Sequence, residues 1–175
     1  MHRSKLTRAA TALAAAVLSL SCAAALAVEP DTMYPALEDC LQAVPQKQEG
    51  VITRWELVSN RQPFGFEIDV LGPNSYVWAM RCTEGNVGAP VRKLGNKDYK
   101  KLTGRVKVPE KSARFTAVGA YPSVSEVSKM QLDIALSFKG TPYYTYELTT
   151  GDGRSATVEV NADTGQIDST KSSRK

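Results

Sequence analysis

The sequence predicts an α+β fold of two tandem units, each with one helix packed on a three-stranded antiparallel β-meander. Three observations predict this fold. Apolar residues recur at helical spacing in two short segments, near 35–47 and 109–121. After each segment come stretches in which apolar and polar residues alternate, as in half-buried strands. The second half of the chain also repeats part of the first at an offset of about 80 residues.

Residues 1–27 are expected to be a secretory signal peptide. Positive charges precede an apolar run at Ala9–Leu20, which is too short to span a bilayer, and 25–27 reads Ala-Leu-Ala, like a cleavage site. The alternative is a lipoprotein anchored at Cys22, but Ser19 stands where the lipobox usually has Leu. We therefore expect an exported protein, periplasmic or extracellular, with no stable membrane insertion after the signal is cleaved.

The first unit is predicted at 28–87. Its helix, from about 35 to 47, has an apolar face with Ala36, Leu37, Cys40, Leu41 and Val44. Strands are expected near 51–58, 64–70 and 75–82, and the last places Tyr76, Trp78, Met80 and Cys82 on one face. The helix is expected to cover the apolar face of this sheet and to leave the other face polar.

The segment 88–105 is predicted to be a basic linker between the two units. A single acid, Asp98, stands against Arg92, Lys93, Lys97, Lys100, Lys101 and Arg105, and Gly and Pro punctuate the segment. The alternative is a docking surface for an acidic partner or for anionic lipid headgroups.

The second unit is predicted at 106–168. Pro109 and Glu110 begin a helix that ends before Pro122, and strands are expected at 132–138, 144–149 and 156–160. A Gly-Asp-Gly sequence at 151–153 predicts a hairpin. In the turn at 161–165, Gly165 is expected to adopt a positive φ. The small, polar residues 169–175 are expected to form a disordered tail.

The repeat aligns FGFEI at 64–68 with YTYEL at 144–148. The same offset continues without a gap and places Gly85 on Gly165 and Val87 on Ile167. Both copies therefore read strand, turn, strand, glycine turn and apolar residue, which predicts one module present twice.

Two motifs of the second unit, PYYTYEL at 142–148 and VEVNADTGQI at 158–167, resemble the PepSY domain family. The family pattern has Asp where this chain has Asn161, and the first unit keeps only the glycine and final apolar residue of that ending. The resemblance implies two tandem PepSY-like domains, the first of them divergent. It also implies a non-catalytic role, with peptidase inhibition or regulation as the usual proposal for the family.

Two cysteines follow the expected signal peptide, Cys40 and Cys82. In an oxidising compartment, two thiols that face one helix–sheet core are expected to form a disulfide. The loop-entropy model gives such a bridge about 4 kcal/mol of stabilisation. The alternative is a pair of buried free thiols.

The expected mature chain has no histidine, because the only one is His2. Ser-His and Cys-His catalysis, His-ligated zinc and His-ligated haem are therefore excluded. No pair of acids forms a recognisable motif, so we predict a protein that is not an enzyme, with no cofactor and no metal. An enzyme that uses only carboxylates, Lys or Tyr is the alternative. Calcium at Asp152 and Asp163 is a further alternative, although turn chemistry explains both residues.

The expected mature chain is also nearly neutral, because three of the 22 basic residues and none of the 18 acids precede Val28. Charge therefore gives no reason to expect nucleic-acid binding. The predicted partner is a protein or an extended peptide, with a secreted peptidase as one candidate. It would pair with an open sheet edge through backbone hydrogen bonds. The alternative is a cell-envelope accessory or structural protein that binds a non-peptidase partner.

Aromatic side chains are the candidate partner contacts. Tyr144 and Tyr146 are expected in the core, because strand alternation explains them. Tyr143 falls outside that alternation, and Trp55 is ambiguous, so these two are the predicted contact residues.

Overall fold

The computed structural model describes residues 33–96, 99–121, 123–134 and 140–173, and it is α+β with one long antiparallel sheet. The expected signal peptide, including Cys22, lies outside the described residues. The helices are α1 (Met33–Lys47), α2 (Tyr99–Thr103) and α3 (Glu110–Gly119). The strands are β1 (Val51–Ser59), β2 (Gly65–Leu71), β3 (Tyr76–Thr83), β4 (Asn86–Val87), β5 (Val91–Asn96), β6 (Val124–Ile134), β7 (Pro142–Thr150), β8 (Ser155–Asn161) and β9 (Ile167–Ser173).

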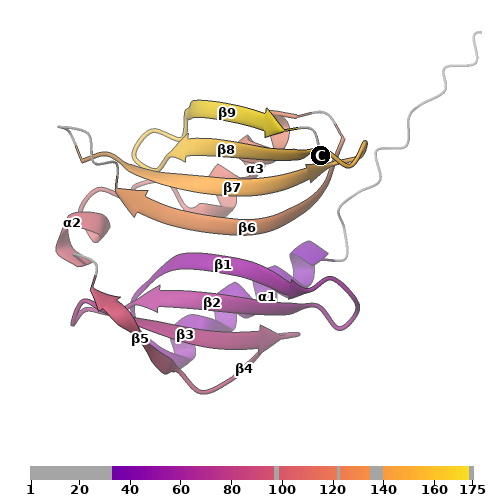
Figure 1. Ribbon diagram of the computed structural model, residues 1–175. Helices are drawn as coiled ribbons and strands as arrows, with labels where there is room; N and C mark the ends of the chain where they lie inside the picture. The colour runs from indigo at the N-terminus through magenta and orange to yellow at the C-terminus, as the bar shows by residue number, and fades with distance from the viewer. Residues whose placement is uncertain (1–32, 97–98, 122, 135–139, 174–175) are drawn as a thin grey trace, which may run out of the picture.

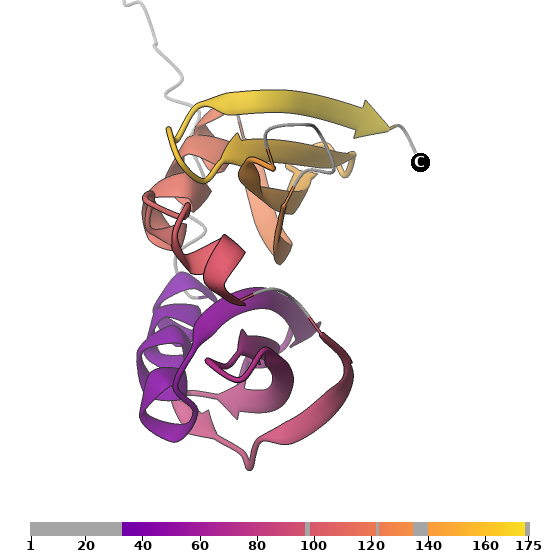
Figure 2. The ribbon, with the colours of Figure 1, turned by 90° about the vertical axis from the view of Figure 1, so that its left-hand side faces the viewer.

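The nine strands form one continuous sheet in the order β4-β3-β2-β1-β6-β7-β8-β9, and β5 pairs with β3 beyond β4 (Figure 1). The view along the strands shows α1 and α3 on the same side of this sheet (Figure 2). α1 contacts β3 and β4, and α3 contacts β7 and β8. The sheet therefore has one face that carries the two longer helices and an opposite, open face.

Most predicted elements are present at nearly the predicted positions. α1 begins two residues before the expected helix, and β1, β2 and β3 lie within about one residue of the expected strands. The strand expected at 132–138 begins much earlier, at Val124, and the last part of the prediction, 135–138, lies outside the described residues. Gly165 has the positive φ, 77°, that the turn predicts.

Two segments carry more structure than their composition predicts. The sequence predicts a basic linker at 88–105, but Val91–Asn96 form β5 and Tyr99–Thr103 form α2, with Leu102 buried. The sequence also predicts a disordered tail from 169, but Ile167–Ser173 form β9 along β8. β5 and β9 are edge strands, which are often short and polar, and this composition is also typical of linkers and tails.

The two halves of the sheet meet where β1 pairs with β6, over three residue pairs. At the centre of this junction Trp55 lies opposite Met130, and both side chains are fully buried. Trp55 also meets Phe66 edge to face, with ring centroids 6.5 Å apart. The helix face of the sheet is therefore one continuous apolar surface across the junction.

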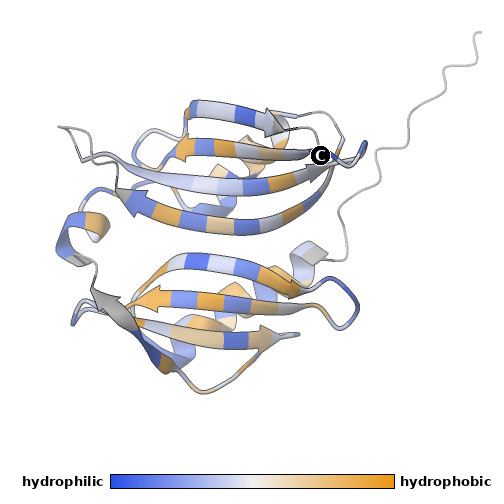
Figure 3. Ribbon diagram, viewed as in Figure 1, coloured by the Kyte–Doolittle hydropathy of each residue, from blue (hydrophilic) through white to orange (hydrophobic). Residues whose placement is uncertain are grey.

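The open face is polar along the same strands. One row of paired residues crosses the sheet from β3 to β9 on this face and runs Arg81, Glu67, Glu56, Lys129, Glu147, Thr157 and Lys171. The alternation of polar and apolar residues that produces the two faces is visible along most strands (Figure 3).

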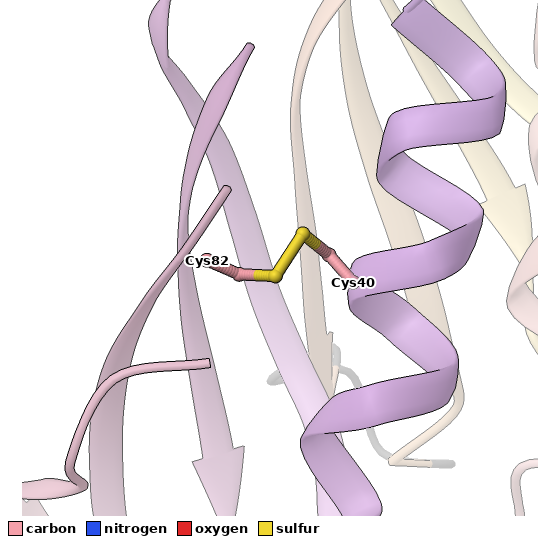
Figure 4. Close-up of a disulfide and its surroundings, with 2 residues drawn as sticks. All are labelled: Cys40 and Cys82. Carbon is pink, nitrogen blue, oxygen red and sulfur yellow. A yellow bond between two sulfur atoms is a disulfide. The ribbon is translucent and has the colours of Figure 1, made fainter. Parts of the chain in front are cut away.

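A disulfide joins Cys40 of α1 to Cys82 of β3 (Figure 4). Its Cα–Cα distance is 5.8 Å, and both residues are buried in the layer between helix and sheet. The bridge therefore fastens α1 to the strand next to the β4–β5 edge.

Substitution of Gly165 by Ala is expected to destabilise the protein by about 1–2 kcal/mol, because its φ of 77° suits glycine. The matched control is Gly119→Ala in α3, where the added Cβ meets nothing within 4 Å. That change is expected to be neutral or to stabilise by up to about 1 kcal/mol. Urea unfolding of the two variants measures both effects. Equal effects of the two substitutions would contradict the conformational argument.

Candidate functional site

The sheet ends in two edge strands whose outer sides have no partner strand among the described residues. One edge consists of β4 and β5, which follow one another along β3, and the other edge is β9. Unpaired backbone N–H and C=O groups along such strands can bind an extended chain as a further strand.

The two predicted contact residues occupy different environments. Tyr143 lies on the open face, opposite Asp133 and Asn161, and is half-buried. Partial burial raises the pKa of its hydroxyl, and the charges of Asp133 and Glu159 raise it further. Trp55 is fully buried at the junction, so its side chain is not accessible to a binding partner. The prediction that Trp55 is a contact residue is wrong, because its side chain lies in the core at the β1–β6 junction, where its indole bonds to Glu110 of α3.

A buried polar cluster lies beneath the junction, between α1 and α3. Arg114 of α3 forms ion pairs with Glu38 of α1 and, at 3.4 Å, with Glu110 one turn earlier. The Trp55 indole donates to Glu110 Oε1 at 3.2 Å, and the Tyr146 hydroxyl donates to the Glu110 carbonyl at 3.1 Å. These contacts join residues of both halves, so the cluster ties the two halves together.

Two charged groups of this cluster are almost removed from solvent. Residue Arg114 is 4% exposed, and burial raises the pKa of the Glu110 carboxyl above its ordinary value. The charge of Arg114 and the hydrogen bond from Trp55 partly offset that rise. Glu110 Oε2 and Arg114 Nη1 are buried without a hydrogen-bond partner in the described part of the chain. Little in the sequence indicates this cluster, because charged residues such as Arg114 and Glu110 are typical of the solvent-facing side of an amphipathic helix.

A second set of charges lies on the open face of the first half. Arg54 pairs with Glu56, with Glu67 at 3.0 Å and with Asp69 at 3.5 Å. Lys93 of β5 pairs with the last two acids, at 3.0 and 2.8 Å. The hydrogen bonds from Lys93 and then Arg54 lower the pKa of Glu67. All three acids are therefore held by neighbouring cations in a shared ion network.

A hollow of about 280 Å³ lies beside this network, at the β4–β5 edge. Glu67, Ala79 and Arg81 line it from β2 and β3, and Val91 and Lys93 line it from β5. Gly88 also lines it, at the bend between β4 and β5. Its walls thus combine small or aliphatic side chains with charged ones.

A larger hollow, of about 340 Å³, lies at the end of β7 and is lined by Arg105, Lys107, Pro142 and Asp163 among others. Lys107 pairs with Asp163 at 2.7 Å, and Arg105 donates to the Gly140 carbonyl at 2.6 Å. These contacts hold the loop before α3 against the end of the sheet.

The two aspartates considered for calcium have local partners. Asp152 accepts hydrogen bonds from the Thr150 hydroxyl at 2.5 Å and from the Arg154 backbone at 3.3 Å, and Asp163 pairs with Lys107. Among the described residues, no group of three or more His, Cys, Asp or Glu side chains has the arrangement of a metal site. No helix in the described ranges is long and apolar enough to cross a membrane.

The fold and these sites define an α+β protein in which the described residues form one antiparallel sheet with two edges that have no partner strand among them. No protein-family model and no curated protein matches the chain. A solved structure does match it, the crystal structure of a "putative lipoprotein" from Clostridium difficile 630, with a TM-score of 0.50 and 13% sequence identity. The match covers 79% of this chain and 93% of that chain. At this identity the likeness concerns the fold alone.

Proposed function

We propose that this protein is an exported, non-catalytic binding protein that pairs with an extended segment of a protein or peptide at a sheet edge. The observation that carries the proposal is that the sheet ends in β4–β5 and β9, two edges with no partner strand among the described residues. Backbone pairing at an edge gives affinity that depends little on sequence, and side-chain contacts then give specificity.

The disulfide supports the assignment to an exported protein. Disulfides persist in oxidising compartments and are rare in the cytosol. The bridge between Cys40 and Cys82 is buried, as expected for a structural disulfide. Together with the expected signal peptide at 1–27, it favours the periplasm or the extracellular space.

The proposal includes two copies of one PepSY-like module, each a helix on an antiparallel meander. Equivalent residues at the offset of 80 support this reading. Phe66 and Tyr146 are both fully buried on central strands, and Gly85 and Gly165 have nearly equal φ, 76° and 77°. The same resemblance suggests a secreted peptidase as the partner, with inhibition or regulation as the outcome.

Titration of the purified, oxidised protein against secreted metallopeptidases from the same source tests this function. Saturable inhibition is expected, because a peptidase segment bound at the sheet edge would be held in a complex in which the protein is not cleaved. Gel analysis in the same samples serves as the control, since a protein that is merely degraded would only compete as a substrate. Absence of inhibition by intact protein would remove the peptidase from the proposal.

A cell-envelope accessory protein with a non-peptidase partner is the second candidate. It is favoured by Cys22 at the end of the apolar run, where an envelope lipoprotein would be anchored. Pull-down from an envelope extract with the oxidised protein distinguishes the two candidates. Recovery of a peptidase supports the first, and a saturable non-peptidase partner supports the second.

A further inference from the structure

We propose that the β4–β5 edge binds an extended acidic peptide, with an apolar side chain of the peptide against Val91 and carboxylates beside Arg81 and Arg92. This inference rests on the proposed function and specifies which edge is used and which peptide chemistry it recognises.

The first support is the shape of this edge. Val91 is an exposed aliphatic residue, 65% accessible, on the strand that ends the sheet. It borders the hollow of about 280 Å³, whose floor has space because Ala79 and Gly88 are small. The bend at 88–90 separates β4 from β5 and leaves this hollow open beside the edge. An apolar side chain of an added strand would therefore find an aliphatic contact and room to enter.

The second support is the state of the cations around this edge. Lys93 is held by Glu67 and Asp69, as described above. Arg81 is exposed and forms no ion pair with any residue that the structure describes. Arg92 is also exposed, and its guanidinium lies 3.6 Å from the centroid of the Tyr76 ring without an acidic partner in the described ranges. Two guanidinium groups that have no acidic partner among the described residues therefore flank the apolar contact, which favours carboxylates on the bound chain.

The two guanidinium groups lie on opposite faces of the sheet. In the strand register Arg92 lies opposite Trp78, which is on the helix face. Arg81 lies opposite Glu67, which is on the open face. Val91 pairs with Ala79 and so shares the open face. Because side chains of an added strand alternate between faces, its two acids must stand an odd number of residues apart.

Trp78 and Ala79 of β3 lie opposite Arg92 and Val91, and Arg81 follows two residues after Ala79. An added strand beside these positions therefore reads acid, apolar residue, any residue, acid. An antiparallel strand would read Glu-Val-Thr-Glu, and a parallel strand would read the reverse, Glu-Thr-Val-Glu. The tighter of these two peptides therefore also reports the direction of the bound strand.

The β9 edge is less suited to such a peptide. The described residues of β8 and β9 carry two acids, Glu159 and Asp168, against one cation, Lys171. The Ser169 hydroxyl donates to Glu159 at 2.5 Å. Ile167, 41% exposed, is the exposed aliphatic residue of this edge and provides a matched position for a control.

Fluorescence anisotropy with labelled peptides of about seven residues, a usual strand length, tests the inference on the full, oxidised protein. One of the two acidic peptides is expected to bind saturably, and its Lys-for-Glu counterpart is expected not to. Val91→Asp is expected to weaken binding about tenfold or more, because it removes the apolar contact and adds a like charge. Arg81→Gln and Arg92→Gln are each expected to weaken it about two- to fivefold, and added salt should reduce the difference.

Ile167→Asp is the matched control and is expected to leave binding of the acidic peptide unchanged. Loss of binding in Ile167→Asp but not in Val91→Asp would overturn the edge assignment while leaving edge binding itself in place. Binding of neutral or basic extended peptides in preference to acidic ones would overturn the peptide chemistry alone. If no extended peptide bound at high micromolar concentration, the proposed function would fail as well. Concentration-dependent dimerisation lost in Val91→Asp would instead assign the edge to a second copy of this chain.

Discussion

Removal of the Cys40–Cys82 disulfide is expected to lower the free energy of unfolding by about 4 kcal/mol. The bridge joins residues 42 apart in the sequence, and the loop-entropy model gives this value for a closed loop of about that length. The loss is a large fraction of the 5–15 kcal/mol that is typical of a domain. Urea unfolding of the oxidised protein and of the variant Cys40→Ala/Cys82→Ala measures it.

Dithiothreitol provides the control for this prediction. It should shift the urea midpoint of the wild-type protein toward that of the double variant and leave the double variant unchanged. Because both cysteines are buried, reduction is expected to be slow without urea and fast within the unfolding transition. A midpoint that reductant leaves unchanged at equilibrium would show that the bridge contributes nothing to stability.

The disulfide and the central strands could be predicted because their signals are local. Cys40 lies on the apolar face of a helix and Cys82 on the apolar face of a strand. Periodicity alone therefore predicts that both side chains face one core. The same reasoning placed Tyr144 and Tyr146 inside, and both are buried. Glycine chemistry gave the positive φ of Gly165 for an equally local reason.

The junction between β1 and β6 could not be predicted in the same way. It consists of three residue pairs between strands that are distant in sequence, and backbone hydrogen bonds carry no sequence signature. Trp55 was therefore ambiguous, because its burial depends on α3 and β6 rather than on its own strand. The cluster of Glu38, Glu110 and Arg114 could not be predicted for the same reason, because its members come from two helices that only the junction brings together.

The edge strands were missed because their composition is unlike that of inner strands. β5 begins with Val-Arg-Lys and β9 is rich in Ser and Thr, so neither shows the apolar alternation of a strand that is covered on one face. Charged and polar residues protect edges from unwanted pairing. The candidate binding site therefore lies in the part of the chain where strand prediction from the sequence is weakest.

Replacement of Arg114 by Met is expected to destabilise the protein by about 3–5 kcal/mol at neutral pH. The change leaves the buried carboxylate of Glu110 without its cation and also removes the ion pair with Glu38. Met keeps the volume of the aliphatic part of the side chain, so the loss reports charge more than packing. The matched control is Arg154→Met, which removes an exposed, solvent-screened pair with Asp152 and should destabilise the protein far less than Arg114→Met.

The pH dependence distinguishes loss of the ion pair from loss of packing. Burial raises the pKa of Glu110 in the folded protein above its ordinary value of 4.5. Below 4.5 its carboxyl is protonated in both the folded and unfolded states, so its favourable contribution to folding is complete there. As the pH rises through the raised pKa, the buried group must ionise and that contribution is lost. Arg114 offsets part of this loss in the wild-type protein, so the deficit of Arg114→Met should be small in acid and grow toward neutral pH.

Removal of the buried carboxylate together with the cation completes the cycle. The double variant Arg114→Met/Glu110→Gln is expected to be more stable than Arg114→Met alone at neutral pH, because no uncompensated charge then remains at that position. Its stability relative to Glu110→Gln should also vary little with pH, since Glu38 is partly exposed and keeps its ion pair with Lys111 at 3.7 Å. Urea unfolding of the four proteins at acidic and neutral pH gives the coupling energy directly. A deficit of Arg114→Met that is the same at both pH values, and that Glu110→Gln does not relieve, would show that Arg114 holds the two halves together by packing and not by its charge.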